Sequence, residues 1–190
     1  GAGGNTTYFL GELSAEGWKH YFPVVFGLKE TLPALILIGA AFWTAIRNTL
    51  RSLRRRWMSR FFDYLGTNLP EFAMILFVLV YWFLSVSGNL NLGFRHLIPT
   101  LPFVYILTAS GIKRFVSGKI WKIAIVFLLI AFQGWEVFGA YPYYLSYFNQ
   151  LGGGLYGGYK YVVDSNYDWG QDLKRLVSLV EEKGIKKIAV

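Results

Sequence analysis

The sequence predicts an all-α polytopic membrane protein with about four transmembrane helices, followed by the start of an outward-facing α/β domain. Only 16% of the 190 residues are charged and 54% are hydrophobic, whereas a soluble globular domain usually has about 25% charged residues. The uncharged residues also gather in four long apolar runs between residues 31 and 140. With no cysteine in the chain, a disulfide framework and a Cys-ligated zinc site are excluded.

The four apolar runs have lengths that suit membrane-spanning helices, which need about 20 mostly apolar residues. The predicted spans are about residues 31–46, 72–92, 97–112 and 120–140. The first and third reach the required length where Lys29, Glu30 and Arg95 extend to water at the membrane interface. The alternative is a set of buried helices in a large soluble protein.

Basic residues are distributed unevenly between the two ends of the predicted spans. Cytoplasmic connections carry the excess of Lys and Arg in membrane proteins, so the more basic side is expected to be cytoplasmic. Both ends of the chain then face outward. Because the basic residues lie between predicted membrane spans, they argue against a nucleic-acid partner. The more basic side holds Arg47, Arg51, Arg54, Arg55, Arg56, Arg60, Lys113, Arg114, Lys119 and Lys122, and the other side holds Lys19, Lys29, Arg95 and Lys160.

Three segments are therefore expected on the outer face: residues 1–30, the turn at 88–96, and residues 141–190. Aromatic residues between 141 and 148 predict an interfacial belt, and the glycine-rich stretch 151–158 predicts a flexible loop. Farther along, an amphipathic helix ending at Gly184 and a strand at 185–190 predict the start of a soluble α/β domain. The helix is indicated by apolar residues at helical spacing: Leu173, Leu176, Val177 and Val180.

Acidic and amide residues are concentrated between residues 164 and 172. Asp164, Asn166 and Asp168 resemble the first ligands of a calcium loop, but Trp169 occupies the position where an EF-hand requires glycine. Two interpretations stay open: a looser site for a divalent cation, or a structural loop. In the second interpretation Asp168 caps the following helix, and Gln171 completes a capping box.

Cationic residues adjoin the predicted outer ends of the spans. Arg95 and His96 follow the short outer turn, and Lys29 precedes the first span. The planar guanidinium of arginine suits a phosphate or a carboxylate. We therefore expect Arg95, His96 and Lys29 to be candidates for binding a phosphate, with ordinary lipid headgroups as the alternative ligand.

Six segments occur in an order that resembles a known family: residues 8–11, 17–23, 29–33, 89–99, 141–149 and 164–173. The most specific are NLNLGFRHLIP at 89–99 and DSNYDWGQDL at 164–173. Together they resemble the C-terminal half of bacterial and archaeal polytopic glycosyltransferases of the GT-C superfamily, similar to the dolichyl-phosphate-mannose–protein mannosyltransferases.

The resemblance implies an integral enzyme of a prokaryotic cell membrane. Its donor would be a polyprenyl-phosphate-linked sugar, and its acceptor a protein, lipid or glycan on the outer face. The resemblance also implies that the acidic catalytic residue lies in an outward loop upstream, so we expect these residues to be part of a longer protein. The alternative is a non-catalytic scaffold or a transporter-like protein. The nearly charge-free spans and the absence of an internal repeat favour the enzyme.

Overall fold

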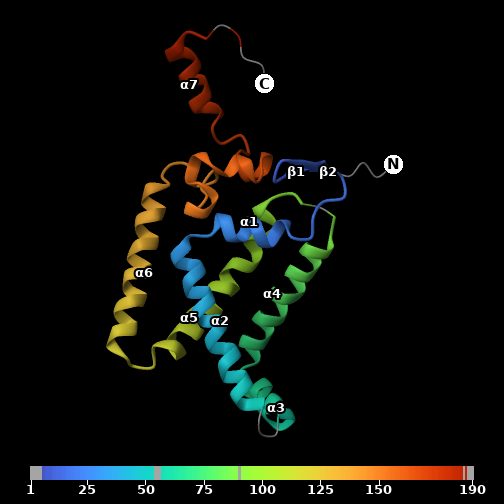
Figure 1. Cartoon of the computed structure of the whole chain (residues 1–190), viewed down its shortest axis with the longest axis vertical. Helices are drawn as coiled ribbons and strands as arrows, with labels where there is room; N and C mark the ends of the chain where they lie inside the picture. The colour runs from blue at the N-terminus through green and yellow to red at the C-terminus, as the bar shows by residue number, and fades with distance from the viewer. Residues whose placement is uncertain (1–5, 54–56, 90, 186, 188–190) are drawn as a thin grey trace.

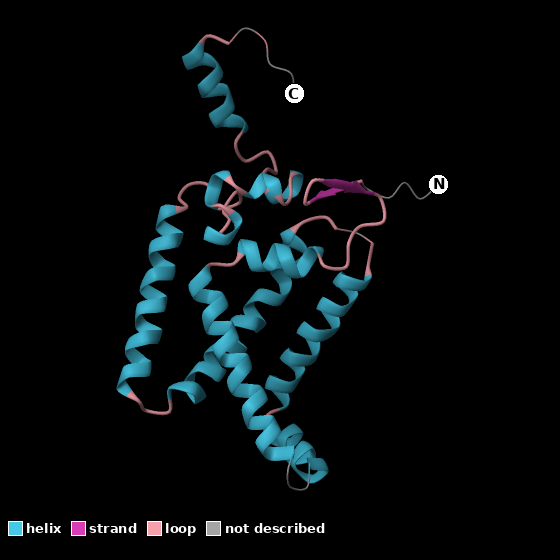
Figure 2. Cartoon of the chain, viewed as in Figure 1, coloured by secondary structure: helices cyan, strands magenta, loops and turns pink. Residues whose placement is uncertain are grey.

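The computed structural model describes residues 6–53, 57–89, 91–185 and 187. Among these residues the structure is mostly helical, and its strands form one small hairpin (Figure 2). Strands β1 (Thr7–Phe9) and β2 (Glu12–Ser14) pair antiparallel, with Thr7 opposite Ser14. Leu10 and Gly11 make the turn between them with φ angles of 52° and 93°, a region that glycine adopts readily.

Seven α-helices and five 3₁₀ helices, which we call 3₁₀ turns, are the other regular elements of the described chain. The α-helices are α1 (Tyr21–Lys29), α2 (Leu32–Leu53), α3 (Trp57–Thr67), α4 (Leu69–Ser87), α5 (Leu101–Val116), α6 (Ile120–Gly139) and α7 (Leu173–Lys183). The 3₁₀ turns are η1 (Phe94–Thr100), η2 (Gln150–Gly152), η3 (Gly154–Tyr156), η4 (Gly158–Lys160) and η5 (Asp164–Asn166).

Three of these helices are long and apolar enough to cross a membrane: α2 over Leu32–Arg51, α4 and α6. They correspond to the first, second and fourth predicted spans. The predicted third span, residues 97–112, begins in η1 and continues into α5, which has 16 residues, and it is not among these three helices. Pro102 lies in the first turn of α5, where its missing N–H costs no helical hydrogen bond.

The long helices expose their apolar side chains. None of the described residues of α4 is buried, although the helix is apolar except at Glu71, Ser85 and Ser87. The buried residue of α6 is Glu136. A helix that is hydrophobic on all sides is normally buried in a protein core or in a membrane. These helices therefore indicate a membrane protein in which lipid covers the exposed faces.

The buried core lies at one end of the long helices, in a part that we call the cap. The cap comprises residues 6–30, 91–100 and 141–172, while α3 and the α5–α6 turn lie at the opposite end (Figure 1). The three predicted outward segments thus meet at one end. The core is a cluster of buried apolar side chains: Phe9, Tyr21, Phe22, Val25, Leu97, Phe148 and Val162.

Two sequence predictions for residues 141–158 are corrected by the cap. Phe148 belongs to the buried core instead of an interfacial belt, although Tyr141, Tyr143 and Tyr144 are exposed. The glycine-rich stretch forms η2, η3 and η4, so it is more regular than a flexible loop. Gly158 is buried against the Phe148 ring, where a Cβ would overlap a ring carbon. A Cβ on the buried Gly152 would lie 3.0 Å from the Phe148 Cβ.

The predicted amphipathic helix is confirmed as α7, which ends at Gly184 in the left-handed conformation with φ 60°. It extends beyond the cap (Figure 1), and its apolar residues Leu173 and Val177 are exposed. The predicted strand at 185–190 lies mostly outside the described residues. The described strands belong to the N-terminal hairpin, so they do not form an α/β domain.

Helices α2 and α5 pack through small residues. A Cβ on Gly111 of α5 would lie 2.6 Å from the Cβ of Ala41 in α2, so Gly111→Ala is expected to push the helices apart. Overpacking of this kind costs about 1–3 kcal/mol, which thermal unfolding of the purified protein in detergent would detect as a lower midpoint.

Gly39→Ala is the matched control, because a Cβ at that α2 position meets no atom within 4 Å. Exchanging glycine for alanine inside a helix is favourable by up to about 1 kcal/mol, so this variant should be at least as stable as the parent. Equal midpoints for the two variants would contradict the close packing of α2 against α5.

Candidate functional site

The cap brings together the two most specific sequence motifs, 89–99 and 164–173, and Lys29, the first cationic candidate along the chain. The backbone N–H of Phe94 donates to Oδ1 of Asn166 over 3.0 Å. The Nζ of Lys29 donates to the carbonyl oxygen of the same Asn166 over 2.5 Å. The Arg95 guanidinium lies 5.8 Å from the centre of the Trp169 ring. Residues 29, 94–95 and 166–169 therefore form one site, although they are far apart in sequence.

Asn166 is the centre of this site. Its side chain is only 2% exposed, and its Nδ2 donates to the Tyr21 hydroxyl over 3.0 Å and to the Val163 carbonyl over 3.2 Å. Each hydrogen-bonding atom of the carboxamide thus has a partner in another part of the cap. A buried polar group without such partners would be strongly unfavourable.

The turn at 91–94 fits closely against η5. The Ser165 hydroxyl donates to the Leu92 carbonyl over 2.5 Å. Gly93 has a φ angle of 103°, and a Cβ at this position would lie 2.6 Å from the Ser165 Oγ. Glycine is therefore required at position 93 both by the backbone conformation and by the contact.

Lys29 faces the interior of the cap. In addition to Asn166, its Nζ donates to the Leu145 carbonyl over 2.5 Å, and it lies 4.2 Å from the centre of the Phe148 ring. Burial lowers the pKa of Lys29 to about 7, because desolvation disfavours the charged amine. Its donors are directed at protein groups, so this structure does not present Lys29 as a cation for a phosphate.

Arg95 and His96 differ from Lys29, and from each other, in their exposure and in their contacts. The Arg95 side chain is exposed, and it has no ion-pair partner within the described part of the chain. The His96 ring lies 6.4 Å from the Phe22 ring, and its Nε2 is buried with no hydrogen-bond partner among the described residues. Burial and the neighbouring Arg95 lower the pKa of His96. Of the three candidates, Arg95 therefore presents the accessible charge.

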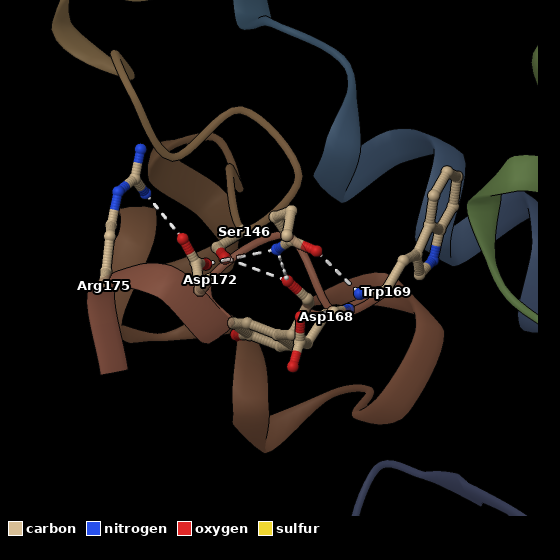
Figure 3. A network of polar contacts seen from close by, with 8 residues as sticks. Ser146, Asp168, Trp169, Asp172 and Arg175 are labelled. Carbon is tan, nitrogen blue, oxygen red and sulfur yellow. Dashed lines mark hydrogen bonds and ion pairs between the residues drawn. The ribbon is translucent and has the colours of Figure 1, made fainter. Parts of the chain in front are cut away.

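The capping prediction for Asp168 is wrong. Helix α7 begins at Leu173, so Asp172 occupies the cap position, while Asp168 Oδ1 accepts from the Gly170 N–H over 2.7 Å. Gly170 has a φ angle of 84°, which turns the chain before the helix starts. Figure 3 shows the resulting network, in which Arg175 reaches Asp172 over 2.6 Å.

The contacts of the same loop give little support to a site for a divalent cation. No group of three or more His, Cys, Asp or Glu side chains within the described residues could hold a metal ion. The Asn166 carboxamide is occupied by protein partners, and the side chain of Asp164 lies outside the description. These contacts favour the structural interpretation of residues 164–168.

Three buried polar residues of the cap region were not sequence candidates for the site. Glu30, which was expected to extend to water at the interface, is only 6% exposed. Asn149 joins the 3₁₀ turns to the end of α1, because its Nδ2 donates to the carbonyls of Gly27 and Glu30, both over 2.7 Å. The buried Glu30 carboxylate accepts from the Tyr105 hydroxyl over 2.8 Å, and burial raises its pKa. Glu136 accepts from the Tyr147 hydroxyl over 3.2 Å and from Gln150.

The fold and the site define a class: a helical membrane protein with a structured polar cap that exposes one arginine beside a tryptophan. No family model, curated protein or solved structure matches the chain.

Asn166→Ala should destabilise the cap, because it removes one acceptor and two donor contacts, of which the contact to Tyr21 is fully buried. Each buried group left without a partner costs about 1–3 kcal/mol, so the thermal unfolding midpoint in detergent should fall clearly. The control is Asn68→Ala, which alters a half-buried carboxamide that donates to the exposed Thr67. Equal midpoints for the two variants would show that Asn166 does not hold the cap together.

Lys29 should make stability depend on pH. The pKa of Lys29 falls from 10.5 to about 7 in the folded chain, so between these values the unfolded state binds more protons. Stability contributed by Lys29 therefore rises with pH across this window. In thermal unfolding, the midpoint of the parent relative to Lys29→Met should increase from about pH 7 to about pH 10.

The matched control for this pH experiment is Lys160→Met, which alters an exposed lysine of the cap. The difference between the parent and this control should change much less over the same pH range. A constant difference between the parent and Lys29→Met would contradict the lowered pKa.

Proposed function

We propose that the chain is part of a membrane glycosyltransferase that uses a polyprenyl-phosphate-linked sugar and acts on a protein, lipid or glycan acceptor. The observation that carries the proposal is the position of Arg95. It is an exposed cation beside Trp169 in the cap, at the end of helices whose apolar faces are exposed. The resemblance of six ordered segments to GT-C glycosyltransferases supports the same function.

A polyprenyl-phosphate donor needs two environments next to each other. Its lipid chain needs an apolar surface, which α4 and α6 offer along their lengths. Its phosphate needs a cation, and the guanidinium of Arg95 can bind two phosphate oxygens at once. As the bond between sugar and phosphate breaks, negative charge grows on the phosphate, and a fixed cation stabilises that transition state.

The distribution of basic residues supports an outward-facing cap. The last turn of α2 contains Arg51, and the last turn of α5 contains Lys113 and Arg114, at the end opposite the cap (Figure 1). Lys and Arg are enriched on the cytoplasmic side of membrane proteins. This distribution supports a proposed position of the cap and its arginine on the outer face, and the family resemblance implies a prokaryotic cell membrane.

A non-catalytic scaffold is the second candidate function. It is favoured by the internal use of the cap's polar groups, since Lys29, Asn149 and Asn166 all hydrogen-bond within the chain. The resemblance assigns the acidic catalytic residue to a loop that precedes these residues. Both functions would preserve the cap, but only the enzyme needs the Arg95 charge.

The charge of Arg95 is tested in the full-length protein by measuring transfer of labelled sugar from a short-chain polyprenyl-phosphate donor. Arg95→Ala should lower the rate by roughly 100-fold or more, the usual effect of removing one transition-state contact. Arg95→Lys should retain part of the rate, because it keeps the charge without the planar guanidinium.

Lys19→Ala is the control, because it removes an exposed charge of the cap far from Trp169 in sequence and should leave the rate unchanged. Expression, membrane insertion and the unfolding midpoint are measured for each variant. A full rate in Arg95→Ala would overturn the phosphate contact, and the absence of any transfer by the full-length parent would favour the scaffold.

A further inference from the structure

A cavity of about 220 Å³ lies between the last turns of α6 and the segment 147–155 that follows this helix. The same end of α6 adjoins the cap (Figure 1). Sites for a whole small molecule usually enclose roughly 300–1,000 Å³. This cavity therefore suits one small chemical group of a larger ligand. Neither Arg95 nor Trp169 lines it, so it is separate from the candidate site.

Glu136 is the charged residue of this cavity. It is only 7% exposed, and it takes part in none of the ion pairs among the described residues. Its carboxylate accepts from the Tyr147 hydroxyl over 3.2 Å and from Gln150. Both donors also line the cavity, so the carboxylate lies at its wall.

These two hydrogen bonds leave the charge of Glu136 unbalanced, because both donors are neutral. Buried carboxylates in proteins are normally paired with a cation. A carboxylate also has about four acceptor sites, so two hydrogen bonds leave room for a further donor. The cavity thus offers a ligand both a negative charge and free acceptor sites.

The remaining walls suit a positive charge as well. No residue that lines the cavity is basic, and Phe132 and Trp135 contribute aromatic rings. Aromatic rings attract cations through their faces. An anion would be repelled by Glu136, and a neutral ligand would leave its charge unbalanced. The walls therefore favour an ammonium group.

The position of the cavity along α6 indicates that the ammonium group belongs to a lipid. Helix α6 is long and apolar enough to cross a membrane, so its ends lie close to the lipid headgroups. Glu136 lies within the last turn of this helix. The apolar side chains along the helix, among them Phe127, Leu128 and Trp135, are exposed. They offer a surface for acyl chains beside the cavity.

We propose that this cavity binds the ammonium group of an ethanolamine phospholipid from the leaflet on the cap side. The ammonium group donates to the Glu136 carboxylate and lies beside the aromatic rings, while the acyl chains lie along the exposed face of α6. The phospholipid is a bound ligand and is not a reactant. Its binding does not rest on the proposed sugar transfer, since a scaffold would hold the same lipid.

The test titrates the full-length protein in detergent with short-chain lipids and counts bound lipid by native mass spectrometry. The probes are dioctanoyl phosphatidylethanolamine, its N-acetyl derivative, dioctanoyl phosphatidylglycerol and free ethanolamine. The N-acetyl derivative keeps the chains and the phosphate but lacks the positive charge. The ethanolamine lipid should bind roughly tenfold or more tightly than the other three, because hydrogen bonds between charged groups are the stronger ones.

Two variants locate the binding in the cavity. Glu136→Gln keeps an acceptor oxygen but removes the charge, so the ethanolamine lipid should bind it no more tightly than the N-acetyl derivative does. Gly139→Leu fills the cavity, which Gly139 lines, at a position where a Cβ meets no atom within 4 Å. It should weaken binding by roughly tenfold or more. Gly134→Leu is the matched control, because Gly134 is equally open but lies outside the cavity.

Three outcomes would overturn the assignment. The first is equal affinity of the parent protein for the ethanolamine lipid and its N-acetyl derivative, since the charge would then play no part. The second is an equal effect of Gly139→Leu and Gly134→Leu, which stays informative even where Glu136→Gln does not fold. The third is binding of free ethanolamine as tight as that of the lipid, which would assign the cavity to a soluble amine. None of these outcomes depends on sugar transfer, so failure of the lipid site and failure of the glycosyltransferase proposal are distinguishable.

Discussion

The cap depends on hydrogen bonds that two buried carboxamides supply to irregular backbone. Between residues 150 and 166 the chain runs through four short 3₁₀ turns, which leave more backbone groups unpaired than an α-helix does. Such groups need partners when they are buried. Asn149 satisfies the N–H groups of Leu151 and Gly152 and two carbonyls near the end of α1. Asn166 likewise joins η5 to the turn and to α1, so these side chains fix segments that are more than 70 residues apart.

The same arrangement gives Lys29 and Arg95, two of the cap's cationic residues, different environments. Lys29 lies under η5, where carbonyl oxygens and aromatic rings surround its amine. A lysine can respond to this environment by losing its proton, whereas a guanidinium keeps its charge. Arg95 remains exposed, next to Trp169. The permanently charged Arg95 therefore lies where a ligand can reach it. Lys29, which can lose its proton, lies where the cap needs hydrogen-bond donors.

The molecule also separates two kinds of packing. In the cap, apolar side chains such as Phe9, Phe22 and Leu97 are buried against one another, as in a soluble protein. Along the long helices most apolar side chains are exposed, and the close contact of Gly111 with Ala41 joins α2 to α5. Small residues are common at helix contacts in membranes, where lipid is as apolar as the side chains and close backbone approach supplies the attraction.

The sequence alone predicted four membrane spans, of which three correspond to long apolar helices, and it predicted the amphipathic α7 with Gly184 at its end. These predictions were possible because run length, charge and periodicity are local properties of the chain. It also singled out the residues of the candidate site, including Arg95, Lys29 and Asn166. Tertiary contacts decided their arrangement: the late start of α5, the shift of the helix cap from Asp168 to Asp172, and the burial of Lys29 and Asn149. Each of these depends on partners that are distant in sequence or on a turn conformation, and neither is encoded in the spacing of neighbouring residues.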